Sequence, residues 1–308
     1  MKKLIVVIAV VLALPGTTLL AAPPGTKTFG SIDDAVNAFV GALRSADRKA
    51  LVDILGPKGL PIVSSGDEVA DRAAFKKFIA EYDQVHRVEG GGGKVVLYVG
   101  ADDFPFPIPL VPDGPRWYWD TDAGDDEILF RRVGRNELAT IQVCLAYVDA
   151  QREYYSRDRG TGLLEYAQKL ESTRGKRDGL YWETKPGERL SPLGPLVAEA
   201  RAAGYRKPEP GKREPYHGYL YRLLTAQGSA APGGAYDYIV RGHMIGGFAL
   251  VAYPARYAAS GVTTFIVSHD GDVYQKDLGP KTTEIANAMK TYNPDKTWTL
   301  IASDASSK

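Results

Sequence analysis

The chain has 308 residues, of which 44% are hydrophobic, and 38 Lys and Arg face 37 Asp and Glu, a formal net charge of +1. This balance gives no global field that would attract nucleic acid or an anionic membrane, so neither is expected as a partner. The apolar fraction is typical of a folded protein rather than a disordered one, and the length allows two domains.

The N-terminus has the pattern of a secretory signal peptide. Lys2 and Lys3 precede an apolar run over residues 4–14, and the small residue Ala21 follows a Pro-Gly breaker. The run is shorter than the roughly 20 residues that span a bilayer, and no later segment is long and apolar enough to do so. We therefore predict a signal peptide at residues 1–21 and a mature protein that is periplasmic or secreted, without a transmembrane segment.

Residues 30–133 are predicted to form helices followed by strands. Ser31 and Asp71 are each suited to cap the start of a helix, and a short helix is expected between them over residues 47–55. Strands are expected at residues 94–99, 108–111, 116–121 and 127–132. Helices first and an antiparallel sheet afterwards is an α+β arrangement.

The order of these elements, with Arg-Trp-Tyr-Trp-Asp at residues 116–120 beside an acidic turn, resembles the cone-shaped domains of the nuclear-transport-factor-two and cystatin-like superfamily. The resemblance implies a curved sheet wrapped on a helix. Some members of that superfamily use the resulting pocket for small ligands or catalysis, and others fill it or use it to dimerise. The resemblance therefore permits an enzyme without showing one.

The acidic turn makes Asp120 and Asp122 candidate calcium ligands, because carboxylates at alternate positions ahead of a glycine can coordinate this ion. An EF-type loop would need Asp or Asn in place of Gly124, so the spacing fails. We expect instead a hairpin turn in which both carboxylates bond to nearby backbone and Gly124 takes a positive φ angle.

A central amphipathic helix is predicted over residues 134–155, between two halves of different composition. Its apolar positions recur at helical spacing and are Leu138, Ile141, Leu145, Val148 and Tyr155. The single cysteine of the sequence, Cys144, lies beside this stripe, where burial as a small hydrophobe is favoured over a reactive thiol. With no second cysteine, the chain cannot form an internal disulfide.

Residues 134–308 are predicted to place this helix against an antiparallel meander. The tract 172–215 is polar and rich in Pro, with one short apolar helix at 193–203, and is expected to form exposed surface loops. The strands of the meander are expected at residues 219–224, 247–253, 262–267 and 272–275.

Several segments of this half resemble an uncharacterised family of secreted bacterial proteins, a domain of unknown function. They are residues 219–228, 231–236, 242–254 and 261–267, together with Arg-Arg-Val-Gly-Arg-Asn-Glu at 131–137. A second resemblance is carried by Asn-Glu at 136–137, Gln-Arg-Glu-Tyr-Tyr at 151–155, Tyr-Pro-Ala-Arg-Tyr at 253–257, Ser-Gly-Val-Thr-Thr-Phe at 260–265 and Asp-Gly at 270–271. A helix, a loop and a meander in this order are similar to the globular heads of type IV pilins and type II secretion pseudopilins. Those proteins start with an apolar anchoring helix, whereas this helix lies mid-chain and carries Asp149 and Arg152. The similarity therefore implies a head that can dock but does not polymerise as pilins do.

Two kinds of site are possible in the second half. Its tyrosines either pack with their hydroxyl groups at the rim of the core or form a recognition surface. The candidate binding residues are Tyr219, Tyr221, Tyr236, Tyr238, His243 and Tyr257. His243 is also a candidate general base, although a histidine bonded to backbone at a strand entry is the plainer interpretation. The Gly-rich residues 227–235 lack the Gly-Lys-Ser/Thr ending of a phosphate loop, and no cofactor is expected.

These patterns favour an exported, soluble, non-catalytic binding or scaffold protein of the bacterial envelope, presenting a Tyr- and Gly-rich surface to a protein or glycan. The alternative is a periplasmic hydrolase-like enzyme that uses His243 or a pocket in the N-terminal half.

Overall fold

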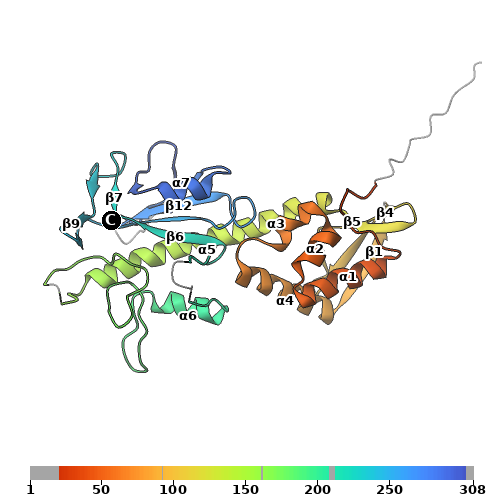
Figure 1. Cartoon of the computed structure of the whole chain (residues 1–308), viewed down its shortest axis with the longest axis horizontal. Coiled ribbons are helices and arrows are strands. Elements are labelled where there is room, and N and C mark those ends of the chain that lie inside the picture. The colour runs from red at the N-terminus through yellow and green to blue at the C-terminus, as the bar shows by residue number, and fades with distance from the viewer. Residues whose placement is uncertain (1–20, 92, 161, 208–211, 303–308) are drawn as a thin grey trace, which may run out of the picture.

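The computed structural model describes residues 21–302 except 92, 161 and 208–211. These residues form an α+β fold, as predicted, in which two lobes are joined by the long helix α5 (Asp125–Tyr155) (Figure 1). Residues 1–20 of the expected signal peptide lie outside the described residues. Among the helices within the described range, none has the length and apolar character needed to cross a bilayer.

The first lobe begins with two capped helices, and the cap of the first is the one predicted. Ser31 and Asp47 accept hydrogen bonds from the amides of Asp34 and Ala50 and so cap α1 and α2. The helices of this lobe are α1 (Ile32–Ser45), α2 (Arg48–Leu55), α3 (Leu60–Val63) and α4 (Glu68–Gln84), with the 3₁₀ turn η1 (Pro57–Gly59).

The expected cap at Asp71 is wrong. Helix α4 starts earlier, because Asp67 accepts the bond from the amide of Ala70 at 3.0 Å. Asp71 is instead a buried residue of the first turn, and its carboxylate accepts hydrogen bonds from the amide and hydroxyl of Ser65. Burial raises the pKa of Asp71 despite these bonds.

The helices of the first lobe pack with a five-stranded antiparallel sheet. Its order is β1-β2-β4-β5, with β3 beside β2. Rings from three elements and a loop fill the interface: Phe39, Phe78, Phe106 and Trp119 lie with ring centroids 5.1–5.7 Å apart. The strands are β1 (His86–Gly91), β2 (Lys94–Val99), β3 (Phe104–Pro105), β4 (Leu110–Asp113) and β5 (Arg116–Trp119).

The strand expected at residues 127–132 is wrong, because these residues belong to α5. The expected boundary between residues 133 and 134 therefore falls inside a helix. The acidic turn is not a hairpin either: it forms the 3₁₀ turn η2 (Thr121–Ala123) and the start of α5. Gly124 has φ −145° rather than a positive angle, and it is required there because a Cβ would collide with the carbonyl of Pro107.

The second lobe contains the predicted meander, a five-stranded sheet in the order β15-β13-β12-β11-β6. Helix α5 lies on this sheet, with Cys144, Tyr147 and Val148 buried in the shared core. Leu138 does not belong to the buried stripe as expected: it is 68% exposed, because the buried residues of α5 begin at Thr140.

The second lobe also has small sheets and two short helices at its periphery. Its helices are α6 (Gly194–Ala202) and α7 (Thr282–Ala288). Its strands are β6 (Tyr219–Leu224), β7 (Ala226–Gln227), β8 (Tyr236–Asp237), β9 (Ile239–Val240), β10 (His243–Met244), β11 (Ala249–Pro254), β12 (Thr263–Ser268), β13 (Val273–Asp277), β14 (Thr291–Tyr292) and β15 (Thr299–Ala302).

Polar side chains of α5 hold the two lobes together. The Arg132 guanidinium donates to the carbonyl of Pro61 at 2.7 Å in the first lobe and to that of Ala259 at 3.4 Å in the second. The amide of Asn136 donates to the carbonyl of Ser260 at 2.8 Å. Burial at this junction lowers the pKa of Arg132.

Candidate functional site

Two of the expected surface tyrosines lie in the core. Tyr219 and Tyr238 are both 0% exposed. Their hydroxyl groups donate to the carbonyl of Thr263 at 2.9 Å and to Oε1 of Gln227 at 3.0 Å, respectively. The expectation that they present a recognition surface is therefore wrong, because they pack inward and satisfy their polar tips within the protein.

The remaining tyrosines do not gather on one face. Tyr221 is half-buried and donates to the carbonyl of Tyr216 at 3.2 Å. Tyr236 is exposed in β8, which lies beyond the C-terminal end of β6. Tyr257 is half-buried and follows β11. The end of β11 pairs with the start of β6, so Tyr257 lies near that other end of β6. The register thus places Tyr236 and Tyr257 at opposite ends of the sheet, and they do not form a single patch.

His243 has a carboxylate partner rather than the expected backbone partner. Its Nδ1 lies 2.9 Å from Oε2 of Glu165, and its side chain is 36% exposed. A carboxylate at Nδ1 fixes the tautomer and leaves Nε2 available to accept a proton. Within the described residues, no serine, threonine or cysteine side chain bonds to this ring, so the pair lacks an activated nucleophile.

The candidate metal ligands of the acidic turn have other contacts. Asp122 pairs with Nζ of Lys58 at 2.9 Å. Burial and the nearby Asp122 raise the pKa of Asp120, which disfavours its charged form. Over the described part of the chain, no group of three or more His, Cys, Asp or Glu residues is placed to hold a metal ion.

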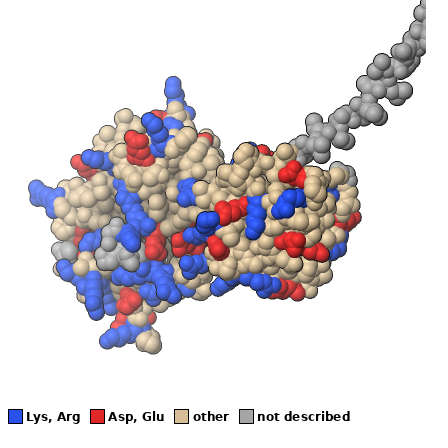
Figure 2. Space-filling view, turned by 45° about the vertical axis from the view of Figure 1, so that its right-hand side comes forward, with Lys and Arg blue, Asp and Glu red and all other residues tan. Residues whose placement is uncertain are grey.

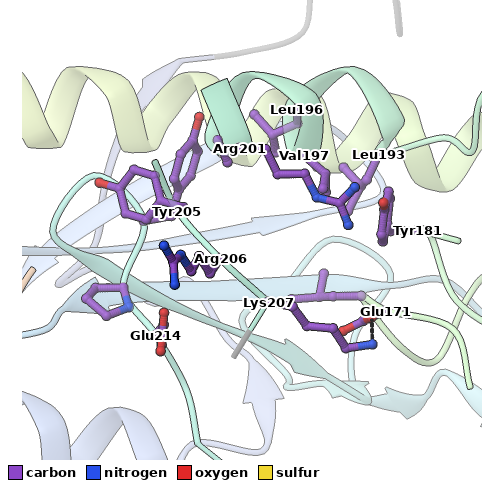
Figure 3. A pocket seen from close by; sticks show the side chains of 14 residues that line it. Glu171, Tyr181, Leu193, Leu196, Val197, Arg201, Tyr205, Arg206, Lys207 and Glu214 are labelled. Atoms are coloured by element: carbon purple, nitrogen blue, oxygen red, sulfur yellow. Dashed lines mark ion pairs between the residues drawn. The ribbon is translucent and has the colours of Figure 1, made fainter. Parts of the chain in front are cut away.

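The feature best suited to bind a ligand is an apolar cavity beside α6, with a volume of about 270 Å³ (Figure 3). Its aliphatic and aromatic lining comes from α6 and the segments on either side of it. This lining includes Leu170, Tyr181, Leu193, Leu196, Val197 and Ala200. The spacing of the last four gives α6 one apolar face, and this face closes the cavity instead of packing fully against the core.

Charged side chains surround the mouth of the cavity. Lys207 pairs with Glu171 at 2.5 Å, and both lie beside Tyr181 in Figure 3. The guanidinium of Arg201 lies 5.4 Å from the centre of the Tyr181 ring. Arg206 is exposed at the same mouth. The rim thus holds three cations and the carboxylates of Glu171 and Glu214, and Arg206 is the rim cation that has no ion pair within the described residues. An apolar interior beside such a cation favours a ligand that joins an apolar group to an anion.

Two polar hollows continue the cavity on either side. One, of about 680 Å³, has α4 as a wall and shares Tyr205, Arg206, Glu214 and Pro215 with the cavity. The other, of about 560 Å³, includes residues 171–177 and shares Glu171, Tyr181 and Lys207 with the cavity. We call the cavity and these two hollows the groove. It touches both lobes, because α4 belongs to the first and α6 to the second.

Tyr205 anchors the groove at the junction of the lobes. Its hydroxyl donates to Oδ2 of Asp67 at 2.8 Å, and the same oxygen accepts from the amide of Gly218 at 2.9 Å. Burial and the Asp67 charge raise the pKa of Tyr205. The ring of Tyr205 meets that of Tyr216 edge-on at 5.0 Å. This network fixes one wall of the groove to the N-cap residue of α4.

The sequence pattern predicts α6 but not the groove. Residues 172–215 were expected to be exposed loops, and their polar composition concealed the few apolar residues that line the cavity. The available signal was the apolar face of a short helix inside a polar tract, since such a face must meet another surface. The partner segments are too far along the chain for local patterns to identify.

The sequence matches the family described as "Protein of unknown function (DUF2950)" over residues 26–301. The chain belongs to this family. The match confirms the resemblance to an uncharacterised domain family, and it covers both lobes and the whole groove. Comparison with curated proteins and with solved structures gave no match. The family description assigns no activity.

Proposed function

We propose that this chain is an exported, non-catalytic binding protein of the bacterial envelope, and that its site is the apolar cavity beside α6. The signal-peptide pattern of residues 1–21 supports export. The likeness of the second lobe to pilin heads supports docking rather than chemistry, and the likeness of the first lobe to cone-shaped domains leaves the choice open.

The cavity is the observation that carries this proposal. Its volume of about 270 Å³ is close to the lower end of the range of small-molecule sites, roughly 300–1,000 Å³. Leu196 and Val197 are only partly buried, and covering their remaining apolar surface with a ligand lowers the free energy. The rim cations Arg201, Arg206 and Lys207 supply the polar contacts that orient a ligand. The partner is a protein or another envelope molecule with an apolar group next to an anion.

A hydrolase-like enzyme is the second candidate, and the pair His243–Glu165 favours it. The carboxylate would hold the imidazole so that its Nε2 accepts a proton from an attacking group. This pair is not part of the cavity lining. In the first lobe, where a pocket was the other possibility, Phe39, Phe106 and Trp119 fill the interior with ring contacts.

A fluorescent anion tests the proposed site. The probe is 1-anilinonaphthalene-8-sulfonate, in which apolar rings carry a sulfonate. We expect its emission to rise on binding, and Ala200→Trp to weaken binding at least about tenfold by filling the cavity. Ala198→Trp is the matched control, because Ala198 is exposed on the same helix and does not line the cavity. Unchanged binding to folded Ala200→Trp protein would show that the cavity is not the site.

A further inference from the structure

We propose that the groove holds an extended acidic peptide segment of another envelope protein, with an apolar side chain in the cavity and acidic residues in the two flanking hollows. This inference rests on the proposed function and names the ligand class of the same site. Three observations support it: the three parts of the groove are continuous, cations line both hollows, and an apolar centre lies between two polar ends.

The groove is continuous because its three parts share lining residues. Tyr205 and Arg206 line both the cavity and the hollow at α4, and Figure 3 places them together on one side of the cavity with Glu214 close by. Glu171 and Lys207 line both the cavity and the other hollow. A ligand confined to the cavity would leave both hollows unused, whereas an extended chain can contact all three parts.

Cations line both flanks of the apolar centre. The hollow at residues 171–177 has Arg174, Lys176 and Lys185, and the hollow at α4 has Lys76 and Arg206. None of these five forms an ion pair within the described part of the chain. Each can therefore pair with an acidic ligand without losing an existing ion pair.

Other charges in the hollows are already paired. Arg72 lies 3.5 Å from Glu68, and Arg177 lies 3.7 Å from Glu188. These pairs reduce the effect of Glu68 and Glu188, so the positive charge of the groove comes from the five unpaired cations. The excess is larger in the hollow at residues 171–177, because Asp67 and Glu214 also line the hollow at α4. Figure 2 shows the same bias more widely: Lys and Arg outnumber Asp and Glu on the visible face of the second lobe, while the signs are mixed on the first.

The order of polar, apolar and polar surface favours a peptide over other anions. A fatty acid has one charged end and one apolar end, so it would leave one basic hollow empty. A glycan needs many hydrogen-bonding groups along its length, and the centre of the groove is lined by Leu170, Leu193 and Val197. An extended peptide advances about 3.3 Å per residue and can place an apolar side chain between acidic ones.

The direct test uses fluorescein-labelled peptides and anisotropy at low salt. The first has two Glu, a Ser, a Leu, a Ser and two Glu; the second replaces Glu by Lys, and the third replaces Leu by Ser. We expect the acidic peptide to bind at least about tenfold more tightly than either relative, with affinity falling as salt rises. Equal affinity for the acidic and the Lys peptide would overturn the proposal.

Charge reversal in each hollow locates the peptide. Lys76→Glu in α4 and Arg174→Glu in the other hollow are each expected to weaken acidic-peptide binding at least about threefold, an ordinary effect for exposed charge pairs. The matched control is Lys77→Glu: Lys77 is the next residue of α4, does not line the groove and lies 3.8 Å from Glu81. We expect Lys77→Glu to bind the peptide like the parent protein.

The outcomes separate this inference from the proposed function. If Ala200→Trp abolishes sulfonate binding but the acidic peptide does not bind, or binds independently of Lys76 and Arg174, the cavity is a site and the extended-peptide inference is wrong. Displacement of the sulfonate by laurate with no competition from the acidic peptide would also overturn it, in favour of a lipid. If neither probe responds to Ala200→Trp, both proposals fail.

Discussion

The two lobes have interiors of different chemistry. In the first, Phe39, Phe78 and Phe106 pack with Trp119, and the only polar atom of these rings, the indole nitrogen, faces the carbonyl of Ala35 at 3.4 Å. The second is built around tyrosines. Its fully buried tyrosines are Tyr147, Tyr219, Tyr238, Tyr253 and Tyr292.

Most of the buried hydroxyl groups of the second lobe have a partner. Tyr147 donates to the carbonyl of Ala249 at 3.3 Å, and Tyr253 donates to Oδ1 of Asn287 at 2.9 Å. A buried hydroxyl without a partner is costly, so the position of each bonded tyrosine also fixes the place of its acceptor. The first core therefore depends chiefly on shape, whereas the second depends on shape and on hydrogen-bond geometry. A tyrosine-rich sequence can thus indicate a core rather than a recognition surface.

Removing a ring from the first core is expected to cause the largest loss of stability. Phe39 contacts three other rings, so Phe39→Ala is expected to lower the free energy of unfolding by about 4 kcal/mol through lost burial and a residual cavity. Urea titration followed by tryptophan fluorescence measures the loss. Phe130→Ala is the control, because Phe130 is 80% exposed and should change stability by less than about 0.5 kcal/mol. Similar losses for the two variants would contradict the assignment of Phe39 to the core.

The next largest effect concerns the junction between the lobes. Arg132→Met keeps much of the side-chain volume but leaves the carbonyls of Pro61 and Ala259 without their donor. It also removes one of the two cations near the buried Asp71, so that only Arg48, at 3.5 Å, stays beside this carboxylate. We expect a loss of about 2 kcal/mol. Because these bonds join the lobes, the variant should also unfold in two transitions that fluorescence and far-UV circular dichroism report at different urea concentrations.

Arg135→Met is the matched control for the junction. Arg135 is exposed one turn further along α5, and within the described residues it forms no ion pair. Its replacement should leave both the midpoint and the coincidence of the two signals unchanged. If Arg132→Met behaves in the same way, the lobes are coupled by the continuous helix alone.

Local patterns predicted the elements whose ends are set locally. Ser31 caps a helix as expected, and β6 spans the predicted residues 219–224, because capping and alternation depend on neighbours in the sequence. The start of α5 was missed because residues 127–132 are rich enough in apolar side chains to suggest a strand. What fixes the helix start is the close approach of Gly124 to Pro107, a tertiary contact.

The groove was not predictable for a similar reason. Lys76 and Leu196 are separated by more than a hundred residues, and the junction that places their elements together depends on Tyr205 and Asp67. Two of the candidate binding residues, Tyr219 and Tyr238, were assigned wrongly for a different reason: composition alone cannot tell inward from outward tyrosines. Tyr238 and Tyr236 are two residues apart, yet one is fully buried and the other is exposed.

Tyr238 and Tyr236 give the test with the smallest expected effect, and it is the most specific one for the role of buried hydroxyl groups in the second lobe. Tyr238→Phe keeps the ring but removes the donor to Oε1 of Gln227, a residue whose amide nitrogen already donates to the carbonyls of Pro232 and Gly234. Gln227 cannot turn to satisfy the oxygen without breaking those bonds, so we expect a loss of about 1 kcal/mol in urea titration. Tyr236→Phe should change stability very little. Equal stability of the two variants would mean that the buried hydroxyl of Tyr238 adds nothing to stability beyond its ring. The two lobes would then differ in composition but not in the kind of interaction that stabilises them.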